Sequence, residues 1–255
     1  MRKLIYLIVT FSVFLVFWGC SSHQEKVVWI ARDPSWYPVN MMGKGDNLLS
    51  FTDELLYAVA KDQGLHVELF TVSTGSLMEG LDEKVYTAVI SFVVPTDMNK
   101  EDYLFSDPYY LIGPVLVVQN SSNIKKLADL QGKILGVQTG SSFIFDAKNY
   151  PDISISTYEN IQFALENLSK GQIDGVIMDS IAADVYTSSF YKGKLEIASG
   201  ILTKGGLRLI VLKDKSEEEI ISLFNTGLQK LKEDGRYGAL LEKWGLFNPE
   251  KNEKK

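Results

Sequence analysis

One pattern occurs twice in this sequence, as LDEKVYTAVISF at residues 81–92 and as LSKGQIDGVIMD at residues 168–179, and it decides the fold. In each copy, a leucine that ends a helix comes seven residues before a short apolar strand. When the two leucines are aligned, Phe92 and Asp179 occupy the same position, at the carboxyl end of the strand. Ligands of open α/β sheets bind outside the carboxyl ends of the strands. Phe92 and Asp179 are therefore candidate ligand contacts in two lobes of similar design.

Strands alternate with helices in both halves of the chain. The first half has predicted strands at 27–31, 67–70 and 88–92, and helices around 51–60 and 77–81. The second half has predicted strands at 134–138, 155–158 and 175–178, and helices at 143–148 and 161–168. Thr52, Asp53 and Glu54 favour the start of the first helix, and Gly64 its end. The alternation predicts an α/β protein in which each lobe is a mostly parallel sheet flanked by helices.

Two extended segments are predicted to connect the lobes, 115–119 after Gly113-Pro114 and 207–212 after Gly205-Gly206. If both cross over, the helix that follows Ser216, its predicted N-cap, returns to the first lobe. The predicted bounds are 27–112 with 208–248 for the first lobe, 113–207 for the second, and 249–255 for a polar tail. A two-strand hinge of this kind supports closure around a ligand.

The amino terminus has the composition of a secretory signal peptide. Arg2 and Lys3 precede an apolar run at 4–18, which is short for a membrane span. Cys20, the only cysteine, follows Gly19 in a string that resembles a bacterial lipobox. Residues 1–19 are therefore predicted to be a cleaved signal peptide, Cys20 to carry palmitate or a similar lipid, and 20–26 to be a tether. The alternative is an uncleaved anchor with an incidental cysteine.

The composition limits the possible chemistry. The chain has 255 residues and a formal net charge of −6, which argues against a nucleic-acid partner. Its two histidines are His23 and His66, so histidine triads and histidine-rich zinc sites are excluded. We expect no metal, no cofactor and no catalytic residues.

Several short patches, in this order and at these spacings, resemble one family. They are Phe105 to Tyr110 (FSDPYY), Leu127 to Lys133 (LADLQGK), Gly136 to Ser141 (GVQTGS), Asp234 to Tyr237 (DGRY) and Lys243 to Gly245 (KWG). The chain resembles the extracellular solute-binding proteins of polar amino-acid ABC transporters, bacterial family 3, which include glutamine-binding protein. The resemblance implies a type II periplasmic-binding-protein fold and a monomer that captures a small solute by lobe closure. It also implies delivery to an ABC permease and its ATPase in the cell envelope, with the lipid at Cys20 as the membrane contact. Position 21 is a serine and not the aspartate that often retains lipoproteins at the inner membrane, so the sequence leaves both the inner and the outer membrane as locations of the anchor.

The resemblance also implies ligand contacts. Asp179 takes the place of the acidic residue that holds the ligand's ammonium group, which charge-assisted hydrogen bonds favour. The turn with Gln138, Ser141 and Ser142 offers hydroxyls and backbone N–H groups to a carboxylate. Further contacts are expected from the first lobe, at Asp33, Trp36 and Phe51. The alternatives are that Asp179 caps the helix near Ser180, and that Trp36 and Phe51 are core residues.

The stretch after the third strand departs from the family. Where the family places an arginine that clamps the ligand carboxylate, this chain has Asn99; Val94 and Phe92 replace a threonine and a glycine. Lys100 lacks the planar fork of arginine. An unpaired carboxylate in a desolvated cleft is costly, so either another cation substitutes or the ligand is not a standard amino acid. Candidate substitutes are Lys44, Arg32 and Arg208.

Three functions remain open from the sequence. The first is a substrate-binding lipoprotein of an ABC importer, which makes or breaks no bond. The second is an enzyme on the same fold, similar to cyclohexadienyl dehydratases, and the missing arginine argues against it. The third is a receptor-fold protein with a non-amino-acid ligand, or an adhesin or sensor.

Overall fold

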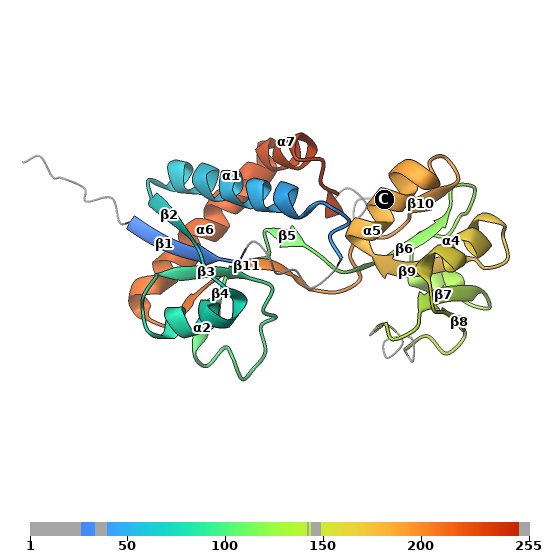
Figure 1. Cartoon of the computed structure of the whole chain (residues 1–255), viewed down its shortest axis with the longest axis horizontal. Coiled ribbons are helices and arrows are strands. Elements are labelled where there is room, and N and C mark those ends of the chain that lie inside the picture. Colours follow the sequence, from blue (N-terminus) through green and yellow to red (C-terminus); the bar gives the residue numbers. More distant parts are fainter. Residues whose placement is uncertain (1–26, 34–39, 142, 144–148, 250–255) are drawn as a thin grey trace, which may run out of the picture.

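The described residues, 27–33, 40–141, 143 and 149–249, form two β-sheets flanked by helices in this computed structural model (Figure 1). The sheets lie toward opposite ends of an elongated molecule (Figure 1). We call each sheet with its helices a lobe. The α/β fold predicted from the repeat is confirmed.

The first sheet has the strand order β2-β1-β3-β11-β4, with β5 paired to β11. The strands are β1 (Val27–Arg32), β2 (His66–Thr71), β3 (Ala88–Ser91), β4 (Tyr103–Phe105), β5 (Tyr110–Leu111) and β11 (Gly206–Leu212). β1 runs parallel to β2 and β3, whereas β11 is antiparallel to its three neighbours. The sheet is thus mixed, with its parallel part at the strands that alternate with helices.

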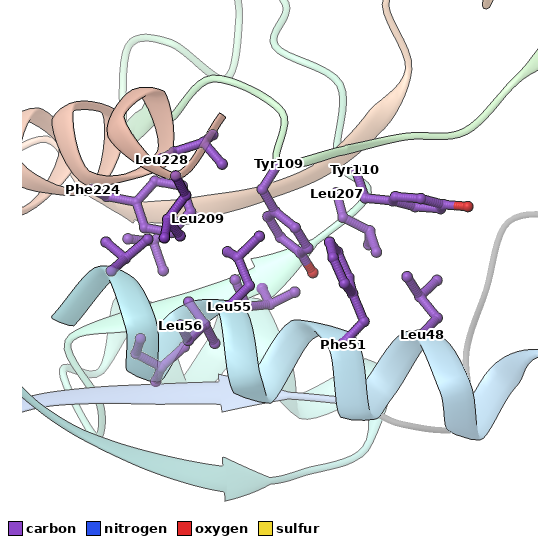
Figure 2. Packing of buried hydrophobic residues seen from close by; sticks show 14 of the residues in the cluster. Leu48, Phe51, Leu55, Leu56, Tyr109, Tyr110, Leu207, Leu209, Phe224 and Leu228 are labelled. Carbon is purple, nitrogen blue, oxygen red and sulfur yellow. The ribbon is translucent and has the colours of Figure 1, made fainter. Parts of the chain in front are cut away.

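Helices cover both faces of the first sheet. α1 (Gly45–Gln63), α6 (Lys215–Glu233) and α7 (Arg236–Lys243) lie on one face, and α2 (Thr74–Asp82) on the other (Figure 1). The larger core forms under the first group, where Phe51 and Leu55 of α1 meet Tyr109, Leu209 and Phe224 (Figure 2). Strand residues alternate between this core and a smaller one under α2, as the period of a strand requires.

The second sheet has the order β10-β6-β9-β7-β8. Its strands are β6 (Pro114–Gln119), β7 (Ile134–Gln138), β8 (Ser154–Tyr158), β9 (Gly175–Asp179) and β10 (Leu195–Ile197). Its helical elements are the 3-10 turn η1 (Leu127–Leu130), α4 (Ile161–Ser169), α5 (Ser180–Val185) and the π-helical turn η3 (Tyr186–Phe190). β7 is parallel to β8 and β9, and β6 is antiparallel to β9 and β10. Each lobe therefore joins a parallel unit to one long antiparallel strand.

The chain passes between the sheets twice, from β5 to β6 and from β10 to β11. The two connections contact each other, since Ile112 N–H donates to the Gly205 carbonyl and Leu202 N–H to the Pro114 carbonyl, at 3.3 and 2.8 Å. β11 itself begins at Gly206, inside the first sheet. The lobe bounds at 112/113 and 207/208 stay a prediction.

Two local predictions about helix ends were wrong. α1 begins at Gly45, a full two turns before Thr52, because Leu48 also packs into the core. α6 is capped by Asp214, whose carboxylate accepts from the Ser216 N–H at 3.1 Å. The predicted end of α1 is confirmed: Gly64 has a φ of 66° and caps the helix.

No helix within the described ranges combines the length and the apolar character that crossing a membrane requires. The predicted signal peptide, Cys20 and the tether at 21–26 lie outside those ranges, as do Trp36 and Ser142.

Candidate functional site

A cavity of about 540 Å³ lies at the carboxyl ends of β7 and β9. The residues that line it are Asn40, Met42, Pro114, Gln138, Thr139, Gly140, Ser141, Phe143, Ile161, Ile177, Met178, Asp179, Ala182 and Tyr186. The structure therefore brings three of the predicted site residues, Gln138, Ser141 and Asp179, to one cavity. Gln138 ends β7, Ser141 follows it, and Asp179 ends β9. Because β7 and β9 are parallel neighbours, their carboxyl ends bring these side chains to the same edge of the sheet.

Asp179 ends β9 and stands at the N-cap position of α5, but its side chain makes no capping hydrogen bond. The carboxylate has no hydrogen bond or ion pair with the described residues, and burial raises its pKa. Capping does not explain an aspartate here. Asp179 is also the one charged side chain among the described residues that line this cavity. The site therefore favours a cationic group.

The turn from Gln138 to Ser141 uses some of its donors inside the protein. Gly140 has a φ of 81°, which allows the tight turn. The N–H groups of Thr139 and Ser141 donate to the carbonyls of Tyr158 and Gln138, at 2.8 and 3.0 Å. The Ser141 hydroxyl accepts from the Phe143 N–H at 3.3 Å. The N–H groups of Thr139 and Ser141 are therefore engaged inside the protein, and the contact of this turn with a ligand carboxylate stays a prediction.

A second, smaller cavity of about 30 Å³ lies at the carboxyl ends of the first sheet. Its lining comprises Arg32, Asp33, Leu49, Thr52, Leu77, Ile90, Ser91, Phe92, Tyr109 and Leu207. Asp33 and Phe92, both predicted site residues, meet here. Thr52, the residue after Phe51, is buried and hydrogen-bonded to the Tyr109 hydroxyl at 3.0 Å.

The three cations considered as replacements for the missing arginine each have an internal partner. Arg32 forms a two-pronged pair with Asp53, at 2.7 Å for both bonds, and also donates to Thr71. Arg208 is buried, which lowers its pKa, and donates to the carbonyls of Ser106 and Lys204. Lys44 donates to the Gly245 carbonyl at 2.8 Å. Among these three, only Arg32 lines either of the two cavities.

Three further predicted residues lie away from both cavities. Phe51 is fully buried, and its ring centroid lies 5.7 Å from that of Tyr110 (Figure 2). The ring centroid of Tyr237 lies 5.8 Å away. Asn99 holds a turn, because its side chain accepts from the Thr96 N–H at 2.7 Å and donates to the Val94 carbonyl at 3.0 Å. Val94 is 47% exposed in the same loop. We therefore leave Phe51, Asn99 and Val94 out of the candidate site.

Several cavity residues have no counterpart among the predicted ones. Asn40 and Met42 reach the second lobe's cavity from the segment before α1, and Tyr186 from the turn after α5. The Tyr186 hydroxyl accepts from Gln162 at 2.8 Å. Tyr186 follows Asp179 by seven residues, or about two helical turns. This spacing places the two residues on the same side of a helix, and it was the sequence signal that could have identified Tyr186. The sequence around Asn40 and Met42 contains no motif that predicts their place in the cavity.

Within 27–33, 40–141, 143 and 149–249, no group of three or more acidic, histidine or cysteine side chains is placed to hold a metal ion.

Comparison with known proteins agrees with this architecture. Residues 28–247 match the model of the bacterial extracellular solute-binding proteins, family 3. The arginine-binding extracellular protein ArtP of Bacillus subtilis (strain 168) is 26% identical, over 96% of this chain and 98% of its own length. The L-cystine-binding protein TcyJ of Escherichia coli (strain K12) is also 26% identical, over 87% and 83%. These relatives are receptors and not enzymes.

Solved structures show the same fold. The second substrate-binding domain of a putative amino acid ABC transporter from Streptococcus pneumoniae Canada MDR_19A is 28% identical, with a TM-score of 0.60 over 85% of this chain and 99% of that chain. The unliganded, open L-cystine solute receptor of Neisseria gonorrhoeae is 24% identical, with a TM-score of 0.66 over 87% and 93%.

Proposed function

This chain belongs to the bacterial extracellular solute-binding proteins of family 3, and from that membership we propose that it is the substrate-binding lipoprotein of an ABC importer. It captures a small amino-acid-like solute between its lobes in the cell envelope and delivers it to a membrane permease. The lipid on Cys20 holds it at the membrane. The two contacting connections between the sheets support closure as the mechanism of capture.

The observation that carries the ligand assignment is the carboxylate of Asp179 in the larger cavity, which has no partner among the described residues. An ammonium group of the solute pairs with it and offsets the cost of burying that charge. A ligand carboxylate turns toward the hydroxyls of Thr139 and Ser141 and the Gly140 N–H, since the other two amides of the turn are engaged.

The charge of the site favours solutes with a net positive charge over acidic ones. Neither lysine nor arginine occurs among the described residues that line the larger cavity. Neutral donors stabilise one carboxylate only moderately. A second acidic group on the ligand would meet Asp179 without a compensating cation. Two of the relatives are named for arginine and for cystine, both of which carry an α-ammonium group.

Thermal unfolding of the full chain in mild detergent tests this proposal. The panel comprises L-arginine, L-histidine, L-cystine, L-glutamine and L-glutamate. A ligand present at a hundred times its dissociation constant stabilises the protein by about 2.7 kcal/mol, a readily visible rise in Tm. We expect a rise with at least one cationic or neutral amino acid, none with glutamate, and loss of the rise in Asp179→Asn.

Asp152→Asn is the matched control, because Asp152 is an exposed aspartate of the second lobe that lines neither cavity. It should keep the rise in Tm. The absence of any shift across the panel, or a shift that survives in Asp179→Asn, contradicts the proposal.

A further inference from the structure

The first sheet leaves an apolar patch uncovered on the face where α2 packs. The patch consists of Val27, Trp29, Phe70 and Val85, which are 40%, 44%, 38% and 57% exposed. The rings of Trp29 and Phe70 are in contact, with centroids 5.7 Å apart. Trp29 and Val85 line one cavity of about 210 Å³, and Val27 shares the face of Trp29 by strand alternation. The four side chains thus form one surface.

The patch exists because α2 is short. This helix has nine residues, and its Leu77 and Leu81 pack over Ala31 and Val89. Trp29 lies two residues before Ala31 on the same face, beyond the cover of these leucines. Contiguous apolar patches are uncommon on monomeric soluble proteins, and large ones mark contacts with a partner or a membrane.

The chain outside the described residues joins the sheet at this patch. β1 begins with Val27, itself a member of the patch. Between Cys20 and Val27 lie only residues 21–26, so the two residues are at most about 25 Å apart when this stretch is fully extended. That length is below the roughly 30 Å diameter of a small domain. A lipid on Cys20 therefore holds this end of the first lobe against the bilayer and leaves it little freedom to turn away.

We propose that the patch of Val27, Trp29, Phe70 and Val85 rests on the lipid bilayer, with the Trp29 indole at the level of the headgroups. This inference rests on the lipid anchor of the proposed function. Tryptophan favours this interface because its ring is apolar and its N–H is polar. An apolar patch beside the lipid adds buried apolar area to the membrane contact and so strengthens it.

The charges around the patch suit zwitterionic headgroups. Lys84 and Asp214 face each other at 4.0 Å and are 71% and 50% exposed, and both line the cavity beside Trp29. Figure 1 shows the start of β1 at the end of the molecule opposite to the second sheet. Docking through the patch therefore leaves the cavity with Asp179 clear of the membrane.

Depth-dependent quenching tests the proposal on the full, lipidated chain. The protein is reconstituted into vesicles of phosphatidylcholine and phosphatidylethanolamine, with or without bromine on the upper acyl chains, which quenches nearby indoles. We expect quenching of tryptophan emission in the wild type and its loss in Trp29→Phe. Trp244→Phe is the matched control and should keep the quenching, because Trp244 lies on the opposite face of the sheet, bonded to Glu54 at 2.8 Å.

Flotation of the same vesicles distinguishes a wrong assignment of the patch from a wrong assignment of the lipid anchor. A chain that floats with the vesicles but shows no loss of quenching in Trp29→Phe overturns the patch and leaves the anchor standing. A chain that does not float overturns the anchor and this inference together, while the thermal shift with amino acids remains a separate readout. Shielding of Trp29 from aqueous iodide that grows with protein density identifies a second copy of the chain as the occupant and also overturns the proposal.

Discussion

At the scale of single residues, Asp179 combines a structural cost with a functional use. Its carboxylate is partly buried, lacks a described partner and lines the larger cavity, so burial raises its pKa. The ionised form is therefore less favourable in the folded protein than in the unfolded chain. Asp53 shows the opposite arrangement, since its carboxylate is paired with Arg32. A cost of this kind is expected where a side chain serves a ligand instead of the fold.

Replacing Asp179 with asparagine should stabilise the unliganded protein at neutral pH by on the order of 0.5 kcal/mol. A raised pKa means that the folded protein binds the proton more tightly, so wild-type stability falls relative to the variant as the pH rises through that pKa. Below the ordinary aspartate value of 3.8, where both states are protonated, the two proteins should be equally stable.

Urea unfolding at several pH values measures this difference. Asp53→Asn is the contrasting control, because it breaks the pair with Arg32 and should destabilise the protein. If Asp179→Asn is less stable than the wild type at neutral pH, the carboxylate has a structural partner and the functional assignment weakens.

At the scale of elements, β11 determines how the two lobes are joined. The strand enters the first sheet directly after the crossing and pairs with β5, β3 and β4. Its first residue, Gly206, allows this close approach: a Cβ there would lie 2.8 Å from the Tyr110 carbonyl oxygen and 2.9 Å from Pro108. A backbone atom cannot rotate aside as a side chain does. The glycine is therefore required by packing at the crossing.

Gly206→Ala should destabilise the protein by about 1–3 kcal/mol, because the added methyl overpacks a backbone contact. Gly238→Ala in α7 is the matched control, since a Cβ there meets nothing within 4 Å. In a helix, this second change should stabilise the protein by about 0.5–1 kcal/mol. Chemical denaturation of both variants provides the measurement. Equal stability of the two variants would show that β5 and β11 yield to the methyl group.

At the scale of the whole molecule, both lobes contribute to one junction. Ile181 of α5 packs with the core of the first lobe. Burial raises the pKa of Asp184, also on α5, and the ammonium group of Lys44 opposes that rise. The pKa of the Tyr110 hydroxyl is also raised, mainly by burial and in smaller part by the Asp184 carboxylate. The lobes are thus coupled through α5, the helix that begins directly after Asp179.

The radius of gyration should fall when the amino acid that raises Tm in the panel is added, because ligand contacts stabilise the closed arrangement. Small-angle X-ray scattering of the full chain measures this change, in a detergent whose own scattering is matched to that of the solvent. Asp179→Asn should keep the unliganded radius at the same amino-acid concentration. A radius that stays constant while Tm rises would place the ligand in one lobe and exclude closure.

The sequence by itself determined the two-lobe α/β architecture, the family and the position of Asp179. These depend on short-range patterns: strand and helix periodicity, the spacing after Leu81 and Leu168, and a glycine that ends α1. The sequence also predicted that Gln138 and Ser141 lie at the carboxyl edge of the sheet, because they end and follow a predicted parallel strand.

Only the tertiary structure decided which side chains reach the cavities. Phe51 packs against Tyr110 and Tyr237, and Arg32 pairs with Asp53, partners that lie 21 to 186 positions away in the chain. Asn99 holds its own turn through hydrogen bonds with the backbone of Thr96 and Val94. An aromatic ring or a guanidinium group satisfies a core contact and a ligand contact equally well, because both need the same apolar area or the same hydrogen bonds. The choice between them depends on what long-range folding places beside the side chain.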